Sequence, residues 1–157
     1  MRVALGTDHA GFELKEKLKA ELARLGHEAV DLGTYSTDPV DYPDFCFPVA
    51  EKVAAGAVDR GIVLGGSGIG ESIAANKVAG IRASVVTSDE TAQLTRLHND
   101  SNVLALGGRT NSHEDALRWL RIWLETPFEG GRHVARLAKI LEYERSHSST
   151  GQAHESA

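Results

Sequence analysis

The stretch RGIVLGGSGIGESIAANK, residues 60–77, runs from an apolar segment through a glycine-rich turn into a helical pattern. A buried strand that leads directly into a helix is the repeating unit of parallel α/β proteins. Backbone amides at the start of such a helix also bind anions. The stretch therefore predicts an α/β fold, and its turn is the first candidate for a binding site.

The same unit recurs on both sides of this stretch. Apolar runs typical of buried strands occupy residues 2–8, 27–33, 60–66, 82–88 and 102–108. Helical patterns follow the glycine turn and also occupy residues 11–26, 45–56, 89–99, 112–125 and 132–146. The apolar runs are continuous, which indicates parallel strands covered on both faces. We predict a Rossmann-like, doubly wound, five-stranded parallel sheet with helices on both faces, plus a C-terminal helix.

The length of 157 residues fits one domain with a sizeable core. We expect this domain to cover residues 1–146. The small, polar residues 147–157 are expected to form a disordered tail. Within the helix expected at 45–56, Pro48 is placed in the first turn, where proline is tolerated.

Composition excludes several classes of function. A formal charge of -5 disfavours a nucleic-acid groove, because duplex binding requires many lysines and arginines. The single cysteine, Cys46, excludes an intrachain disulfide, and its apolar neighbours indicate a core residue. No segment reaches the roughly 20 apolar residues that span a bilayer, and no signal peptide is recognisable. We expect a cytoplasmic protein, and the spacing of histidines and cysteine predicts no metal site.

Three short polar segments follow three of the predicted strands. They are TDH at 7–9, GGSGIGE at 65–71 and GGR at 107–109. In a parallel sheet the carboxyl ends of the strands meet at one edge, where ligands bind. We therefore expect these segments to crowd one rim of the sheet.

The glycine turn carries the carboxylate of Glu71. The turn lacks the position and spacing of a dinucleotide fingerprint and the lysine of a P-loop. Glu71 is either a first-turn carboxylate favoured by the helix dipole or a general base, which that dipole and local amides are expected to keep ionised. Ser67 is either a turn residue or a ligand for a substrate oxygen.

Other polar residues also allow two interpretations. Asp8 and His9 end an otherwise apolar strand, which favours a functional pair over a structural histidine. His98 and Asn99 fit a helix C-terminus as well as a catalytic role. Arg132 and Arg136 share one helix face and fit either a solvated surface or a phosphate clamp, with Arg109 as a third member.

Five segments together resemble the ribose-5-phosphate isomerase B family, which also contains galactose-6-phosphate isomerase subunits. They are GTDHAGFELK, DYPDF, GGSGIGESIAANK, AQLTRLHNDSNVLALGGR and EGGRHVARL, in unbroken order from residue 2 to about residue 145. The resemblance implies interconversion of ribose 5-phosphate and ribulose 5-phosphate without metal or organic cofactor. It also implies a Rossmann-like fold and a homodimer or dimer of dimers with shared active sites.

The resemblance further implies a role for each matching residue. Asp8 and His9 match the substrate-binding pair, and the loop of Gly66, Ser67, Gly68, Ile69 and Gly70 matches the segment that holds the sugar and the enediolate. His98 matches the acid that opens the furanose ring, and Asn99 matches a substrate contact. Arg109, Arg132 and Arg136 match the phosphate ligands.

One position departs from many members of the family. Gly65 stands where those members carry a catalytic cysteine, and glycine cannot take a proton. The sequence is similar to the branch whose base is a glutamate at the end of the loop, here Glu71. Two alternatives stay open: an isomerase of allose 6-phosphate, galactose 6-phosphate or a tetrose 4-phosphate, and a sugar-phosphate-binding protein without activity.

Overall fold

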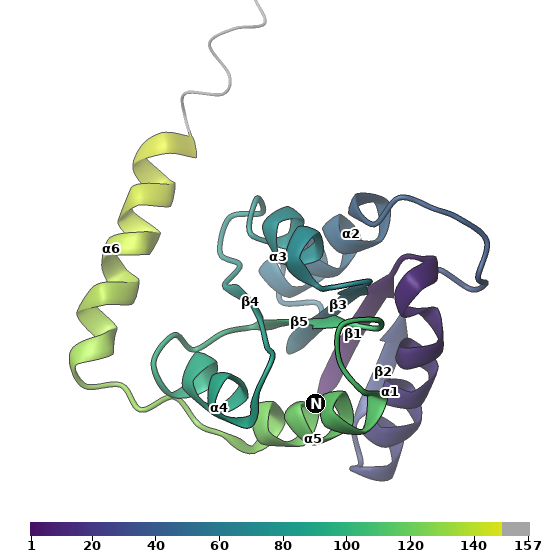
Figure 1. Ribbon diagram of the computed structural model, residues 1–157. Coiled ribbons are helices and arrows are strands. Elements are labelled where there is room, and N and C mark those ends of the chain that lie inside the picture. Colours follow the sequence, from purple (N-terminus) through teal and green to yellow (C-terminus); the bar gives the residue numbers. More distant parts are fainter. Residues whose placement is uncertain (149–157) are drawn as a thin grey trace, which may run out of the picture.

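The predicted parallel sheet is present in the computed structural model, which describes residues 1–148 (Figure 1). All neighbouring strands of this sheet run parallel. Their spatial order is β2-β1-β3-β5-β4, with β1 at Arg2–Thr7, β2 at Glu28–Asp31, β3 at Arg60–Gly65, β4 at Ala83–Val85 and β5 at Val103–Gly107. The five apolar runs of the sequence thus correspond to these five strands, and the predicted fold class is confirmed.

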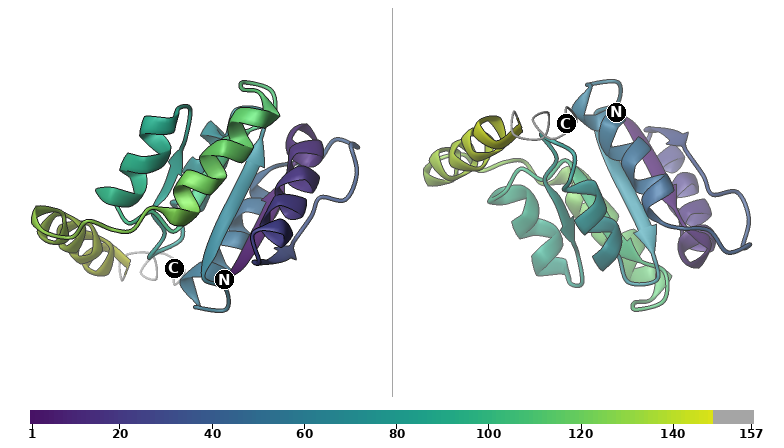
Figure 2. Two further views of the ribbon diagram at one scale, coloured as in Figure 1. Left: turned by 90° about the horizontal axis from the view of Figure 1, so that it is seen from below. Right: turned by 90° about the horizontal axis from the view of Figure 1, so that it is seen from above.

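Helices cover both faces of the sheet, as the continuous apolar runs predict (Figures 1 and 2). One face carries α1 (Phe12–Arg24), α4 (Asp89–Leu97) and α5 (His113–Glu125). The other face carries α2 (Pro43–Ala54) and α3 (Ile69–Ala75). A short 3-10 helix, η1 (His9–Gly11), links β1 to α1, and α6 (Arg132–His147) follows α5.

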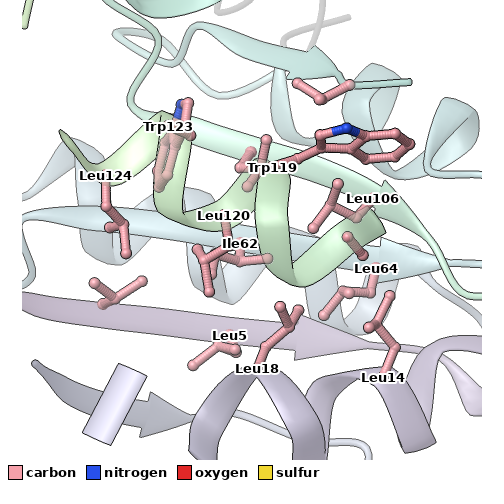
Figure 3. Packing of buried hydrophobic residues seen from close by; sticks show 14 of the residues in the cluster. Leu5, Leu14, Leu18, Ile62, Leu64, Leu106, Trp119, Leu120, Trp123 and Leu124 are labelled. Atoms are coloured by element: carbon pink, nitrogen blue, oxygen red, sulfur yellow. The ribbon is translucent and has the colours of Figure 1, made fainter. Parts of the chain in front are cut away.

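Two apolar layers hold the helices to the sheet. Between the sheet and helices α1 and α5, Leu14 and Leu18 of α1 pack near Trp119, Leu120 and Trp123 of α5 (Figure 3). Sheet residues in this layer include Leu5, Ile62, Leu64 and Leu106. Smaller side chains fill the opposite layer, among them Ala4, Val49, Val63, Ala74 and Ala105. Because both faces of the central strands are buried, burial of apolar surface is the main force that fixes this arrangement.

Local signals in the sequence set several helix boundaries. Ser88 begins α4 with a reciprocal capping box to Thr91, and the hydroxyl of Ser112 caps α5. Gly26 follows α1 with a φ of 83°, in the left-handed region that commonly ends helices. These contacts satisfy backbone groups that the helix itself leaves unpaired.

The prediction for the start of α2 was wrong. The helix begins at Pro43, so Pro48 lies inside the helix instead of in its first turn. Proline fits the first turn because its nitrogen needs no hydrogen-bond partner there, and Pro43 meets that requirement. Pro48 lacks the N–H that a helix interior normally uses, and the surrounding buried side chains of α2 hold the segment helical nonetheless.

Helix α6 projects from the rest of the protein (Figure 1). His133 is its one buried residue among those described, and Val134 and Leu141 are 54% and 42% exposed. Near its far end, the Glu144 carboxylate accepts a hydrogen bond of 3.0 Å from the Gly80 amide. Several apolar side chains of α6 are therefore largely uncovered within one chain.

Two further predictions concern the chain ends and membranes. Most of the tail predicted to be disordered, residues 149–157, lies outside the described residues. Across residues 1–148, none of the helices combines the length and the apolar character that a bilayer crossing requires.

Candidate active site

The three polar segments that follow β1, β3 and β5 meet at one rim of the sheet. The Gly108 amide donates to the Gly65 carbonyl over 2.7 Å, and the Arg109 amide donates to the Gly66 carbonyl over 3.0 Å. The Asp8 amide points to the carbonyl of Leu64 at 3.4 Å. The strand order reverses between β1 and β3, so this rim is the switch point where open α/β sheets bind ligands.

Glu71 places its carboxyl group inside this rim. Gly68 adopts a φ of 81° as the residue before α3, so the chain turns sharply and Glu71 falls in the first helical turn. The residue is only 4% exposed. A Cβ atom added to Gly65 would overlap with the Glu71 carboxyl group. The carboxyl therefore occupies the space next to the backbone at residue 65, which only glycine leaves free.

Burial dominates the electrostatics of Glu71. Desolvation raises the pKa of the Glu71 carboxyl above its usual range, and the nearby charge of Asp8 adds to the increase. The amides of Gly68 and of Glu71 itself act in the opposite direction and are outweighed. The amides thus favour the ionised form, as the sequence predicts, but burial sets the direction of the shift in pKa. A carboxylate with a raised pKa is a stronger base, which suits proton abstraction.

Asp8 and His9 are fixed by short backbone contacts. The Asp8 carboxylate accepts a hydrogen bond of 2.9 Å from the Ala10 amide and so caps η1. The Nδ1 atom of His9 accepts from the Val40 amide over 3.2 Å. In the neutral ring this leaves Nε2 as the donor, directed away from that contact.

His9 and Arg109 share a pocket of about 280 Å³ with Glu13, Thr37 and His113. A histidine and an arginine in one pocket at the rim suit a phosphate group. The roles of Thr37 and His113 in this lining were not predicted, because neither residue ends a predicted strand. His113 is held in place by a Lys17 Nζ contact of 2.9 Å to its Nδ1 atom.

Ser67 keeps both of its predicted interpretations. Its hydroxyl oxygen accepts a hydrogen bond of 3.2 Å from the Ile69 amide, as a turn residue does. The side chain is nevertheless partly exposed at the rim.

Tyr42 is a neighbour of the loop that was not predicted. A Cβ atom added to Gly70 would lie 2.7 Å from the Cζ atom of Tyr42, so the phenol ring packs over Gly70.

The other predicted site residues lie elsewhere in the chain. Helix α4 runs back from the rim, so His98 and Asn99 at its end lie near the amino end of β4, where the Arg82 Nε atom donates 3.0 Å to the Asn99 carbonyl. The His98 ring stacks on His133 of α6, with ring centroids 4.3 Å apart. Arg132 and Arg136 are exposed on α6.

The predicted residues thus form two separate groups. The rim group contains Asp8, His9, Gly66, Ser67, Gly68, Ile69, Gly70, Glu71 and Arg109. The α4–α6 group contains His98, Asn99, Arg132 and Arg136. The rim group lies at the carboxyl ends of β1, β3 and β5, whereas the α4–α6 group lies near the amino end of β4 in the same chain.

Two neighbours of the α4–α6 group were not predicted to be functional. The Glu129 Oε2 atom lies 3.3 Å from His133 Nε2 and 3.8 Å from His98 Nε2. The only available signal is the four-residue spacing of Glu129 and His133 in EGGRH, and it does not reveal that His98 lies beside them.

Cys46 is fully buried, as predicted, and desolvation together with the charges of Glu71 and Asp8 raises the pKa of its thiol.

The chain is similar to known proteins over nearly its whole length. The family model described as Ribose/Galactose Isomerase matches residues 3–140. Ribose-5-phosphate isomerase B of Escherichia coli is 47% identical over 92% of this chain and 97% of its own length. The enzyme of Clostridium thermocellum has a TM-score of 0.92 at 48% identity, covering 94% of this chain and 99% of that one. The Mycoplasma genitalium structure with bound ribulose 5-phosphate has a TM-score of 0.89 at 40% identity, covering 92% and 96%. The chain therefore belongs to the ribose/galactose isomerase family.

Proposed function

We propose that the protein interconverts D-ribose 5-phosphate and D-ribulose 5-phosphate without metal or organic cofactor. The observation that carries the proposal is the Glu71 carboxyl, buried at the rim of the sheet with a raised pKa. Relatives with at least 40% identity and nearly full coverage are named ribose-5-phosphate isomerase B. A cytoplasmic location and a place in pentose phosphate metabolism stay predictions.

Aldose–ketose isomerisation needs a base that moves one proton between neighbouring carbons. Glu71 is assigned to remove the proton α to the carbonyl and to return it to the adjacent carbon. The resulting enediolate requires fixed hydrogen-bond donors, and the amides of the loop 66–70 supply them without rearrangement. Burial of Glu71 contributes by making its carboxylate more basic.

The phosphate group is assigned to cationic side chains away from the reacting carbons. His9 and Arg109 line one pocket beside the loop. Arg132 and Arg136 complete the clamp, and His98 opens the furanose ring as an acid–base group. Binding energy from the phosphate then positions the sugar for proton transfer.

The separation of the two groups supports a site built from two chains. In a single chain, Glu71 lies at the carboxyl ends of the strands, away from His98, Arg132 and Arg136 near the amino end of β4. We therefore propose that these three residues complete the active site that contains Glu71 of a partner chain in a homodimer. Exposed apolar side chains on α3 and α6 offer an interface: Ile69 is 58% exposed, Ile73 56% and Ile140 50%. Large exposed apolar surfaces commonly mark association sites.

A coupled assay with ribose 5-phosphate tests the proposed function. Glu71→Gln keeps the size of the side chain but removes its basicity, so turnover should fall by roughly 10²–10⁴-fold while substrate still binds. Glu114→Gln, at an exposed position on α5, should retain wild-type turnover and serves as the matched control.

The alternatives are outcomes of the same assay. Allose 6-phosphate and erythrose 4-phosphate, run in parallel, identify a different sugar phosphate as the preferred substrate. No turnover of any of these compounds by the wild-type protein would favour a binding protein. Near-normal turnover by Glu71→Gln would refute the assignment of the base.

A further inference from the structure

His98, Glu129 and His133 bring three metal-binding atoms together. One ring nitrogen of each histidine and a carboxylate oxygen of Glu129 all lie within 4.8 Å of one another. The backbone holds this arrangement, because the Glu129 amide donates to the Leu97 carbonyl over 3.0 Å, next to His98. The loop before α6 is thereby attached to the end of α4.

One nitrogen in this cluster lacks a hydrogen-bond partner. His133 is 5% exposed, and its Nε2 atom is the only buried side-chain nitrogen or oxygen without a hydrogen bond among residues 1–148. Glu129 Oε2 is the close carboxylate oxygen, at 3.3 Å, but it does not make a hydrogen bond with that nitrogen. Burial of an unsatisfied polar atom is costly, so Nε2 of His133 is a position at which a ligand would be stabilising.

We propose that His98, Glu129 and His133 bind one Zn²⁺ ion, with water as the fourth ligand, and that bound Zn²⁺ inhibits the enzyme. Imidazole nitrogens and a carboxylate are ligands that suit Zn²⁺ better than Mg²⁺ or Ca²⁺. The inhibition, but not the binding, rests on the proposed role of His98 in ring opening. A metal-bound His98 cannot exchange the proton that this step requires.

Two of the three distances between the ligand atoms are already close to those of a zinc site. Zinc bonds of about 2.0–2.2 Å place tetrahedral ligand atoms roughly 3.3–3.5 Å apart. The separation of 3.3 Å between Glu129 and His133 already matches, and the 3.8 Å between Glu129 and His98 is slightly longer.

The histidine rings must change their relative orientation. Their planes differ by only 16°, so their lone pairs run side by side instead of converging. The His98 side chain is 35% exposed and the Glu129 side chain 54%, whereas that of His133 is 6% exposed. His133 therefore acts as the fixed ligand, and the other two close around the ion. The neighbouring Arg132 is exposed, so its charge is screened by solvent.

Titration of the full-length protein with Co²⁺ tests the binding directly. Four-coordinate Co²⁺ gives strong visible absorption, whereas the hexa-aqua ion absorbs weakly. We expect strong bands that saturate at one ion per chain and disappear when Zn²⁺ is added. Glu129→Gln and His133→Gln should each weaken binding by more than the roughly 10–100-fold that loss of an outer contact costs.

His27→Gln provides the matched control, because it removes the histidine directly before β2 and leaves the cluster of His98, Glu129 and His133 intact. It should keep the bands. Glu129 is exposed, so Glu129→Gln keeps the test informative if His133→Gln fails to fold. Weak, six-coordinate spectra for the wild-type protein, or undiminished bands in Glu129→Gln, would overturn the metal site.

Activity measurements separate this inference from the proposed function. Zn²⁺ at saturation should lower turnover of ribose 5-phosphate at least about tenfold, and EDTA should restore it. Bands without inhibition would refute the inhibitory role of the ion. An inactive wild-type protein would count against the proposed function, while the Co²⁺ spectra would still decide the metal site.

Discussion

The burial of Glu71, the proposed base, carries a cost in stability. Its carboxyl fills the space that Gly65 leaves beside the backbone, where water is excluded and Asp8 is close. These surroundings make the carboxylate more basic. They also make its ionised form unfavourable in the folded protein, because removing a charge from water costs free energy.

The stability of the protein should therefore respond to Glu71 in a pH-dependent way. Folding raises the pKa of this carboxyl above its ordinary 4.5, so the folded state loses stability relative to the unfolded state as pH rises through the raised pKa. Glu71→Gln should have a higher melting temperature than the wild type at pH 8. The difference should shrink as pH falls towards 4.5.

Thermal unfolding at several pH values measures this effect, and Glu114→Gln should show no comparable pH-dependent difference. If Glu71→Gln melts below the wild type at pH 8, the carboxylate contributes stabilising contacts that outweigh the free-energy cost of burying its charge.

His98 carries a distinct prediction at the residue scale. The furanose ring must open before proton transfer, but erythrose 4-phosphate cannot close such a ring because its terminal oxygen bears the phosphate. His98→Asn should therefore impair turnover of ribose 5-phosphate roughly 10²-fold or more, and that of erythrose 4-phosphate much less. Steady-state rates on both substrates decide the matter. Equal losses would indicate a general structural role for the ring that stacks on His133.

At the scale of elements, Glu21 joins α1 to α5. Its Oε1 atom accepts hydrogen bonds of 2.6 Å from Arg24 in its own helix and from Arg121 in α5. These bonds, with that of Arg24 first, lower the pKa of the Glu21 carboxyl from 4.5 to about 2. The stability from this contact is present above pH 4.5 and is lost as pH falls towards 2.

Glu21→Gln should lower the free energy of unfolding by about 1–2 kcal/mol at pH 7, a modest value because the arginine partners are exposed. The difference should disappear near pH 2. Chemical denaturation at both pH values measures it, with Glu142→Gln on the exposed surface of α6 as a control. A deficit of equal size at both pH values would attribute the effect to packing instead of charge.

The elements were predictable where local patterns determine them. Continuous apolar runs located all five strands, and Gly26, the last residue of the helix predicted at 11–26, adopts the left-handed φ that commonly ends helices. Ser88, placed at the end of a predicted strand, is instead the N-cap of α4. The start of α2 was not predictable from Pro48 alone, because proline is also tolerated inside a helix when surrounding packing is strong. Here Pro43 takes the position at the first turn.

The candidate site was predictable only in part, because some of its contacts join segments that are far apart in the sequence. The rim group follows from strand ends, because a parallel sheet brings them to one edge. The stacking of His98 on His133 joins α4 to α6, and no short-range pattern encodes a contact between segments 35 residues apart in the chain. The burial of Glu71 and its proximity to the charge of Asp8 likewise arise from tertiary packing, so its raised pKa required the three-dimensional structure.

At the scale of the whole molecule, the central feature is the distance between the two groups. The rim group contains Glu71, the proposed base, and one part of the proposed phosphate pocket, while the α4–α6 group contains His98, proposed to open the ring, and two arginines. Helix α6 projects from its own chain with exposed apolar residues (Figure 1). A two-fold dimer is the simplest assembly that brings each group to its complement, since it pairs two sites at once.

Complementation between inactive variants tests this central claim most directly. Glu71→Gln protein is mixed with the double variant Arg132→Ala, Arg136→Ala under conditions that allow subunit exchange. In a shared-site dimer, a heterodimer has one site with both defects and one with neither. The assay with ribose 5-phosphate should then recover roughly a quarter of wild-type turnover after random exchange.

A matched control mixes Glu71→Gln with Asp8→Asn, two defects within the rim group. Every site of that heterodimer carries one defect, so the mixture should stay inactive. Proven subunit exchange without recovery of activity in the first mixture would contradict a site shared between chains, whereas recovery there and none in the control is the result that the structure predicts.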